Sequence, residues 1–312
     1  MVAIWSERKM GSGSSPIFFI IFFSFGYFGI NFPPALLSFF LNVFLYFMDN
    51  FSTKLIDHIF KSETDKYKVF LNAFGQIDLP LLTHKLFPKA IIYRARESSP
   101  DEVMENFSDF SYPPPTDSYS RIGKPGDVWF YASEHFDACL AELLPTWKGE
   151  EGEYLRVTFG IWELKEVLNV LIIPDLENEN QYTKEAKLND QLSASDKEFW
   201  RLVCPYFFQS QEENPEIYLL TSALVTALME QAEKGKLSID GIMYPCVENK
   251  EKTNIALLPH TIDENKIAFK RAEDMLFNQS GEAQGDFPGF EGPKQKREGW
   301  LVPESCKIKW AM

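Results

Sequence analysis

The sequence is poor in the residue types that bind metals and form disulfides. Its 312 residues include only four cysteines and four histidines. No Cys-x-x-Cys, His-x-His or His-x-x-x-His pair occurs among them. Zinc sites are commonly built on such close pairs, so we expect no metal centre. Four widely spaced cysteines in so long a chain also argue against a disulfide scaffold, and they indicate a reducing compartment.

Basic residues are outnumbered by acidic residues. The chain carries 31 Lys and Arg against 45 Asp and Glu, which gives a formal net charge of -14. Binding to nucleic acid without sequence preference needs a basic surface, so we expect no direct nucleic-acid partner. A Gly-x-Gly-x-x-Gly fingerprint is absent as well, and this argues against a Rossmann dinucleotide site.

One long apolar run stands near the N-terminus. Residues 17–48 contain no charged side chain, and Pro33-Pro34 divides the run into two pieces. A membrane span needs about 20 apolar residues. A kinked membrane helix, a re-entrant hairpin and a signal sequence are three interpretations, the last disfavoured because no small-x-small cleavage site follows. The fourth is a mis-assigned start, because Met48-Asp-Asn-Phe-Ser is typical of a natural beginning. Membrane contact through residues 17–48 and a wrong start both stay open.

The remaining chain shows more strand patterns than helix patterns. We expect amphipathic helices within 53–74, a helix capped by Ser133 that runs to about Leu144, a helix from Pro215 to about Glu233, and partial helix in 180–213. Strands are predicted at 89–94, 127–132, 239–244, 253–258 and 266–271, twice within 153–173, and briefly within 300–312, with loops at 98–120 and 279–298. Strands without regularly alternating helices favour an α+β fold over a doubly wound sheet.

The most informative stretch runs from Arg121 to Glu142. It contains an arginine, a Pro-Gly turn, an apolar strand ending in Tyr131 and a helix carrying Glu142. A guanidinium suits phosphate, an aromatic ring attracts a cation, and a carboxylate can stabilise an oxocarbenium ion. NAD+ offers all three partners, because it has phosphates, ribose and a cationic aromatic ring.

The same stretch resembles the RES domain family, whose pattern is an Arg, a Gly-containing turn, an apolar strand ending in Tyr, and a helix with small residues and a Glu. Three further motifs fit in order: Tyr93-Arg94, Asp240-Gly-Ile-Met-Tyr-Pro-Cys246, and Asn254-Ile-Ala-Leu-Leu-Pro259. The resemblance covers about residues 89–272. It leaves an apolar segment at 1–50, a helical lead-in at 51–88, and a flexible loop and tail at 273–312 outside that domain.

The resemblance implies a fold similar to ADP-ribosyltransferase toxins, with a mixed β core and flanking helices. It implies an enzyme that degrades NAD+ by hydrolysis or phosphorolysis, with NAD+ as substrate and no cofactor. Such proteins are usually bacterial toxins, and their usual partner is an antitoxin with a helix-turn-helix domain that plugs the active site. The catalytic domain would then be cytoplasmic, and a membrane segment at 17–48 would anchor it.

The implied site has two groups of residues. Glu142, Arg121 and Tyr131 would be catalytic: Glu142 would orient the ribose and stabilise the oxocarbenium ion, Arg121 would hold a phosphate, and Tyr131 would form a platform for the nicotinamide ring. Arg94, Tyr93, Gly126, Cys246 and Asn254 would bind the substrate, with Arg94 as a second phosphate contact. Cys246 departs from the family pattern, which has Ser there; a thiol is the weaker hydrogen-bonding group.

Helical spacing places Glu142 away from the apolar stripe formed by Phe136, Leu140, Leu143 and Leu144. This fits both a carboxylate at a binding site and a solvated glutamate. Two other functions stay open: a mono-ADP-ribosyltransferase that uses the same site on a protein acceptor, and a non-catalytic nucleotide-binding homologue, of which Cys246 and the extra N-terminal segment would be signs.

Overall fold

The structure is a computed structural model, and it describes residues 53–61, 65–143, 154–177, 188–209, 214–247, 251–278 and 293–311. The apolar run at 17–48, predicted as a membrane segment or a mis-assigned start, lies outside these residues. No helix within the described ranges combines the length and the apolar character that a bilayer crossing requires.

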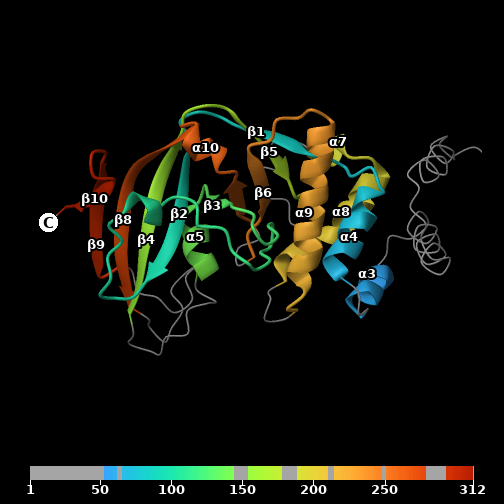
Figure 1. Cartoon of the computed structure of the whole chain (residues 1–312), viewed down its shortest axis with the longest axis horizontal. Coiled ribbons are helices and arrows are strands. Elements are labelled where there is room, and N and C mark those ends of the chain that lie inside the picture. Colours follow the sequence, from blue (N-terminus) through green and yellow to red (C-terminus); the bar gives the residue numbers. More distant parts are fainter. Residues whose placement is uncertain are drawn as a thin grey trace, which may run out of the picture. The chain divides into compact units, whose positions relative to one another are not determined.

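The described strands form one mixed sheet (Figure 1). Its ten described strands follow the order β1-β5-β6-β7-β3-β2-β4-β8-β9-β10. Among the described pairs, β5 and β6 run parallel and the others antiparallel. The predicted α+β class is confirmed. The strands are β1 Thr83–Leu86, β2 Ile91–Ser98, β3 Phe130–Ser133, β4 Tyr154–Leu164, β5 Leu168–Ile172, β6 Gly241–Pro245, β7 Thr253–Leu257, β8 Ile267–Asn278, β9 Gln295–Val302 and β10 Lys307–Trp310.

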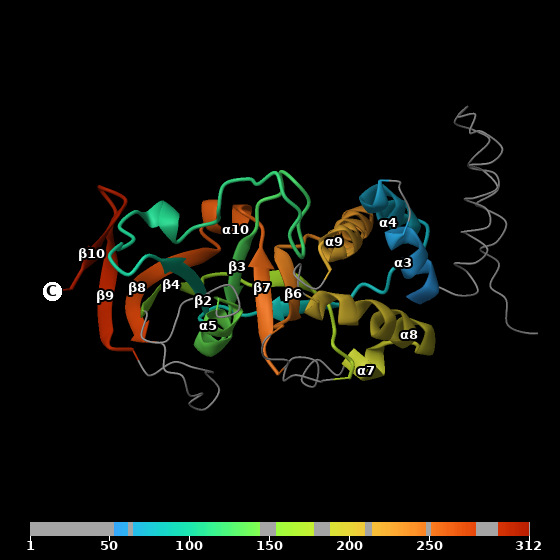
Figure 2. The ribbon, with the colours of Figure 1, turned by 90° about the horizontal axis from the view of Figure 1, so that it is seen from below.

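Helices flank this sheet. They are α3 Thr53–Phe60, α4 Lys66–Gly75, α5 Phe136–Leu143, α7 Leu188–Gln191, α8 Ala194–Val203, α9 Ile217–Lys234 and α10 His260–Asp263, with short 3-10 turns η2 Phe107–Asp109 and η4 Cys204–Phe208. Figure 2 shows α4 beside α9. Lys66 of α4 donates to Glu216 at 2.6 Å, and the Tyr67 hydroxyl lies 3.1 Å from the Thr226 hydroxyl of α9. The predicted helices in 53–74 and 215–233 are therefore confirmed.

A hydrophobic cluster joins α5 to one face of the sheet. Leu140 of α5 packs with Val157 and Phe159 of β4 and with Met275 of β8. Phe136 stacks on Phe159 with ring centroids 4.1 Å apart. Burial of this apolar side of α5 fixes the rotation of the helix, because turning it would expose these side chains to water.

The structure also differs from several sequence expectations. β2 begins at Ile91 and continues to Ser98, so Arg94 lies inside the strand. Ser133 ends β3, three residues before α5 begins; its hydroxyl donates to the Thr253 carbonyl at 2.8 Å and accepts from the His135 backbone N–H at 3.3 Å, directly before the helix. The lead-in at 51–88 is not helical throughout, because it contains β1. The predicted loop at 279–298 is wrong at its end, since β9 begins at Gln295.

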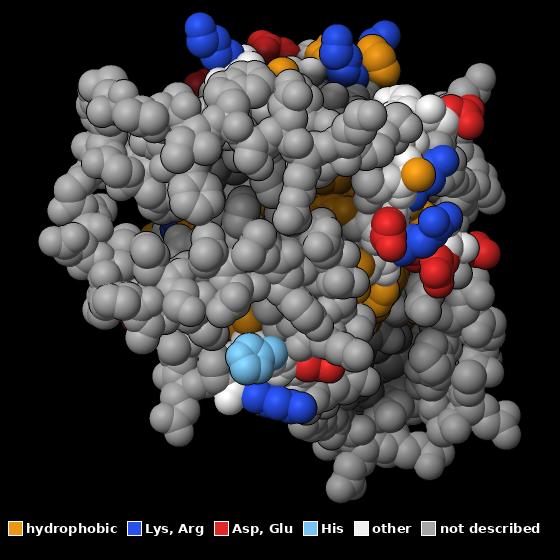
Figure 3. All heavy atoms as spheres, turned by 90° about the vertical axis from the view of Figure 1, so that its right-hand side faces the viewer, with side chains coloured by type: hydrophobic (Ala, Val, Ile, Leu, Met, Phe, Trp, Pro, Cys, Tyr) orange, Lys and Arg blue, Asp and Glu red, His pale blue; other side chains and the backbone are white. Residues whose placement is uncertain are grey.

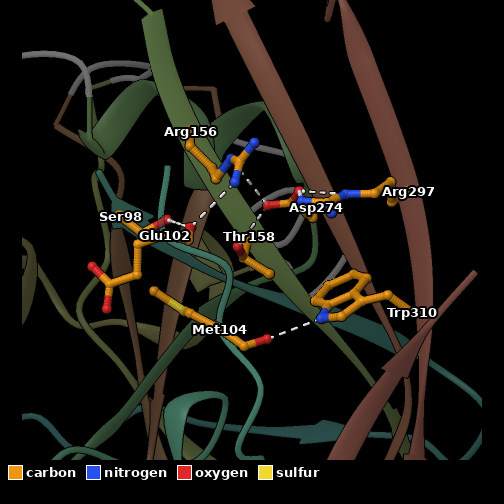
Figure 4. A network of polar contacts seen from close by, with 8 residues as sticks. All are labelled: Ser98, Glu102, Met104, Arg156, Thr158, Asp274, Arg297 and Trp310. Atoms are coloured by element: carbon orange, nitrogen blue, oxygen red, sulfur yellow. Dashed lines mark hydrogen bonds and ion pairs between the residues drawn. The ribbon is translucent and has the colours of Figure 1, made fainter. Parts of the chain in front are cut away.

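Buried polar groups attach the C-terminal hairpin of β9 and β10 to the sheet (Figure 4). Asp274 of β8 accepts from Arg297 of β9 at 2.6 Å and from the Thr158 hydroxyl of β4 at 3.1 Å. The Arg156 Nε atom lies 3.8 Å from the same carboxylate. The Trp310 indole donates to the Met104 carbonyl at 3.1 Å. The expected short strand at the C-terminus is thus an integral part of the sheet.

Charged side chains of both signs lie near one another on one face of the described part of the chain. Figure 3 shows Lys and Arg lying close to Asp and Glu among the described residues of that face. This mixing of the described charges is in keeping with the net charge of -14.

Gly241 allows β6 and β7 to approach each other closely. A Cβ atom at this position would lie 2.4 Å from the Ala256 carbonyl oxygen of β7. We expect Gly241→Ala to lower the free energy of unfolding by about 2 kcal/mol, because backbone atoms must move apart. Urea unfolding measures this, with Gly75→Ala as the control, since a Cβ there meets nothing within 4 Å. Equal stability of the two variants would contradict the prediction.

Candidate active site

A row of polar side chains crosses the centre of the sheet. Tyr93 of β2 pairs in register with Ser133 of β3, Ser133 with Asn254 of β7, and Asn254 with Tyr244 of β6. Directly paired residues of antiparallel strands point to the same face. Tyr131 shares that face, because it lies two residues before Ser133 in β3.

Glu142 is anchored on this row. Its Oε1 atom accepts hydrogen bonds from the Asn254 side-chain amide at 2.8 Å and from the Val247 backbone N–H at 2.9 Å. Asn254 is buried, whereas Glu142 is half-buried. Two donors on one oxygen fix the carboxylate beside the end of β6 and the start of β7. The interpretation of Glu142 as a freely solvated side chain is therefore wrong.

Tyr131 lies in β3 with its hydroxyl 2.8 Å from the Ser120 hydroxyl. Burial raises the pKa of Tyr131, although the Ser120 hydrogen bond and the Arg94 charge act in the opposite direction. The phenol is therefore neutral near pH 7. A neutral ring on this face can stack against a flat ligand.

Arg121 reaches the same region from the loop before β3. Its Nη1 atom donates to the Phe207 carbonyl of η4, and its Nη2 atom donates to the Tyr218 hydroxyl of α9 at 3.2 Å. The guanidinium lies 5.5 Å from the centre of the Tyr218 ring. Burial alone would lower the pKa of Arg121, but Tyr218, Tyr244 and Glu142 together hold it above its ordinary value. Arg121 therefore carries a permanent positive charge.

Tyr244 is the buried member of the cluster. Burial raises its pKa well above the ordinary value, and the nearby Tyr131 and Glu142 add to that shift. Its hydroxyl thus stays protonated at neutral pH. Glu142, Arg121, Tyr131 and Tyr244 consequently combine one fixed carboxylate and one cation with two neutral phenols.

Arg94 occupies the place where β2 and β3 separate. The two strands share the single register pair Tyr93–Ser133. Beyond it, the Arg94 guanidinium donates to the Tyr131 carbonyl at 3.0 Å and lies 5.5 Å from the Phe130 ring centre. Arg94 is 7% exposed, and burial followed by the neighbouring Arg96 lowers its pKa to about 10. Within the described part of the chain its buried Nε has no acceptor.

The sequence matches a known family over most of this region. The RES domain model matches residues 91–278. The chain belongs to the RES domain family. A search of curated proteins found no match to the chain. The RES domain match begins at the first residue of β2 and ends at the last residue of β8. The helices α3 and α4, the strand β1 and the β9–β10 hairpin lie outside it.

Two predicted substrate-binding residues of the RES domain have structural partners. The Tyr93 ring packs edge-on against Phe136 at 6.1 Å, and its carbonyl accepts from the Cys139 thiol at 3.0 Å. Gly126 lies in an exposed turn with φ 88°, a conformation that glycine adopts without a Cβ penalty. Its N–H donates to the Thr116 carbonyl at 2.9 Å. An anion-binding role for the Gly126 N–H has no support in these contacts.

Cys246, which replaces the family Ser, follows β6 and is fully buried. Its backbone N–H donates to the Lys252 carbonyl at 3.1 Å. The residue thus helps to close the loop between β6 and β7, directly before Val247, which donates to Glu142. A thiol near the size of Ser preserves this packing. Its predicted contact with substrate stays a prediction.

The structure adds Tyr218, Ser120 and Tyr244 to the residues singled out from sequence. Tyr218 lies 97 positions after Arg121 in the chain, and no local pattern relates the two. Ser120 stands directly before Arg121 and could have been considered on that ground. Tyr244 lies within a quoted RES domain motif, and only the strand pairing with Asn254 gives it a place in the cluster.

Proposed function

We propose that this chain degrades NAD+ by cleaving the N-glycosidic bond between nicotinamide and ribose, with water or phosphate as the acceptor. The observation that carries the proposal is the fixed carboxylate of Glu142, held by Asn254 and Val247, whose charge also helps to raise the pKa of Arg121. Membership of the RES domain family, whose resemblance implied NAD+ degradation, supports it independently.

The reaction moves one electron pair and leaves positive charge on the sugar. The bond between C1′ of ribose and the nicotinamide nitrogen breaks, and its electron pair passes to the ring nitrogen, whose positive charge disappears. C1′ becomes an oxocarbenium ion. A water oxygen then bonds to C1′ and releases a proton, which gives ADP-ribose and nicotinamide. Phosphate in place of water gives ADP-ribose 1″-phosphate.

The geometry suits Glu142 for stabilising that cation. Both of these hydrogen bonds fall on Oε1, and none of the described residues donates to Oε2. One oxygen thus anchors the carboxylate while the other stays available for a ribose hydroxyl or the developing charge. A negative charge already in position needs no reorganisation during the reaction.

Arg121 suits a phosphate of the substrate on the face of Tyr131, whereas Arg94 alternates with Tyr93 in β2 and would meet a phosphate where β2 and β3 separate. Among the described residues, no carboxylate forms an ion pair with Arg94 or Arg121. Buried charges are normally paired, because desolvation is costly. An anionic ligand would supply the missing partner, and the pyrophosphate of NAD+ is such an anion.

A direct assay tests the proposed reaction. The full chain is incubated with NAD+ in the presence and absence of phosphate, and the products are followed by proton NMR. We expect free nicotinamide together with ADP-ribose or ADP-ribose 1″-phosphate, and the second product identifies the acceptor. Glu166→Gln, a change in an exposed turn residue, serves as the control for an altered surface charge. Unchanged NAD+ in the presence of folded chain contradicts the proposal.

Asn254 provides a second test of the same geometry. We expect Asn254→Ala to lower kcat/KM about thirty-fold, because the carboxylate of Glu142 loses one of its two donors and a charge-assisted hydrogen bond is lost. The kcat/KM of Asn254→Asp should be lower than that of Asn254→Ala, since this change places a second carboxylate against Glu142. Steady-state NAD+ kinetics measure both variants. Activity of Asn254→Asp at or above that of Asn254→Ala would contradict this role.

The family resemblance also suggests a biological setting. We propose that the chain acts as a toxin whose activity is blocked by an antitoxin with a helix-turn-helix domain. Controlled expression in bacteria should lower cellular NAD+ and stop growth, whereas an inactive Glu142 variant expressed at an equal level should do neither. Growth arrest without loss of NAD+ contradicts this toxin mechanism and favours modification of a protein target.

A further inference from the structure

Tyr218 makes two different contacts with Arg121. Its hydroxyl accepts a hydrogen bond from Nη2 at 3.2 Å, and its ring faces the guanidinium at 5.5 Å from the ring centre. Both contacts favour the charged guanidinium, one through a lone pair and the other through the negative face of the ring. Tyr218 is therefore a specific partner of a cation that lacks a carboxylate among the described residues.

Buried neighbours and an ion pair fix the start of α9, where Tyr218 lies. It lies at the second position of α9, between Ile217 and the following turn, and both Ile217 and Leu220 are fully buried. The same end of α9 is fixed to α4 by the ion pair between Glu216 and Lys66. The position of the Tyr218 ring is thus set by the packing of two helices that lie far from β3 in sequence.

Arg121, in contrast, belongs to a loop. The chain before β3 contains a turn in which the Lys124 N–H donates to the Asp127 side chain. The backbone of Arg121 belongs to no helix or strand. A long side chain on a loop loses rotamer freedom when it binds an anion. Its anchors, the Phe207 carbonyl and Tyr218, come from other elements and restrict that freedom before a ligand arrives.

We propose that Tyr218 is a positioning residue that holds the Arg121 guanidinium ready for a phosphate group of the substrate. This inference rests on the proposed NAD+ cleavage, and it assigns Tyr218 no contact with the reacting atoms. Two of the guanidinium donors are used by Phe207 and Tyr218, so the remaining N–H groups stay available for phosphate oxygens.

Substitution of a residue that positions a phosphate-binding side chain is expected to change KM for NAD+ and to leave kcat nearly unchanged. A phosphate contact is equally strong in the bound substrate and in the transition state, because the phosphates do not react. We expect Tyr218→Phe, which removes the hydroxyl and keeps the ring, to raise KM for NAD+ about tenfold with kcat changed less than about threefold. Tyr218→Leu, which also removes the ring, should raise KM about thirty-fold or more.

Tyr206→Phe is the matched control. Tyr206 lies in η4 directly before Phe207 and is half-buried, and the hydrogen bonds and ring contact of Arg121 go to Phe207 and Tyr218 instead. Loss of its hydroxyl should leave KM within about twofold of the wild type. A thermal unfolding midpoint is measured for each variant, so that a general loss of folded protein is separated from a loss of substrate affinity.

A measurement without substrate tests the positioning directly. The side-chain 15N–1H signals of Arg121, assigned by their absence in Arg121→Lys, report how freely the guanidinium rotates. In the wild type we expect slow exchange and hindered rotation, and in Tyr218→Phe faster rotation. The same comparison is repeated for Tyr206→Phe, which should match the wild type.

The outcomes separate the two proposals. Absence of NAD+ cleavage by the wild type overturns the proposed function, while the NMR comparison still tests the positioning of Arg121. Cleavage by the wild type with unchanged KM and unchanged Arg121 signals in Tyr218→Phe overturns the role of Tyr218 alone. A fall in kcat at constant KM also overturns it, because that result assigns Tyr218 to the chemical step.

Discussion

Glu142→Gln is expected to lower kcat for NAD+ cleavage about 10³-fold while KM changes less than about threefold. The glutamine keeps the size of the side chain and an oxygen that can accept from Asn254 and Val247. What it lacks is the negative charge that stabilises the oxocarbenium ion, and this charge acts mainly in the transition state. Single-turnover and steady-state NAD+ assays measure the effect.

The size of this effect distinguishes two roles for the carboxylate. A carboxylate that only orients ribose hydroxyls would lose part of one hydrogen bond on amidation, which corresponds to about tenfold. A Glu142→Gln variant that retains a tenth of the wild-type kcat therefore contradicts a charge-stabilising role. Glu166→Gln should behave as the wild type, and ADP-ribose binding should survive in Glu142→Gln if the site stays folded.

The second large effect concerns stability, since Asp274→Asn is expected to lower the free energy of unfolding by about 3 kcal/mol. Asp274 is 2% exposed, and its carboxylate accepts hydrogen bonds from the Nε and Nη2 atoms of Arg297. Arg156, 7% exposed, lies against the same carboxylate, and its buried Nε makes no hydrogen bond within the described residues. Removing the acid leaves Arg156 buried without a countercharge, with only the Glu102 carbonyl as an acceptor at 3.4 Å, and this costs far more than losing an exposed pair.

Urea unfolding of the full chain measures this change, with Glu105→Gln as the control. Glu105 forms its ion pair with Lys307 at 3.7 Å, and both side chains are more than half exposed. Screened surface pairs contribute little, so the control should lose less than about 0.5 kcal/mol. A loss below about 1 kcal/mol in Asp274→Asn would show that Arg156 and Arg297 find other acceptors.

Local patterns in the sequence were sufficient for the main elements of the domain. The apolar spacing in 53–74 and the Pro215 start predicted α4 and α9 correctly, because buried helices need one continuous apolar side. The apolar segments at 239–244 and 253–258 predicted β6 and β7 to within two residues at each end. The polar residues around 295–302 concealed β9, which is only partly buried and pairs with β8 near one side of the sheet.

Local sequence patterns predicted only part of the candidate site. Arg121, Tyr131 and Glu142 could be singled out because they lie close together in the chain, around one strand and one helix. Tyr218 could not, since its contact with Arg121 depends on where α9 lies. Arg94 was predicted as a phosphate contact, and the structure adds its hydrogen bond to the Tyr131 carbonyl at the separation of β2 and β3.

The sequence by itself determined the α+β class, the order of the principal elements and the family to which the chain belongs, because periodicity and short motifs are local properties. The tertiary structure decided how the charges are arranged. It placed the amide of Asn254 and the N–H of Val247 on one oxygen of Glu142, and it put the hydroxyl of Tyr218 beside Arg121. Hydrogen bonds require heavy atoms about 3 Å apart, and only the packing of distant strands and helices brings these groups so close.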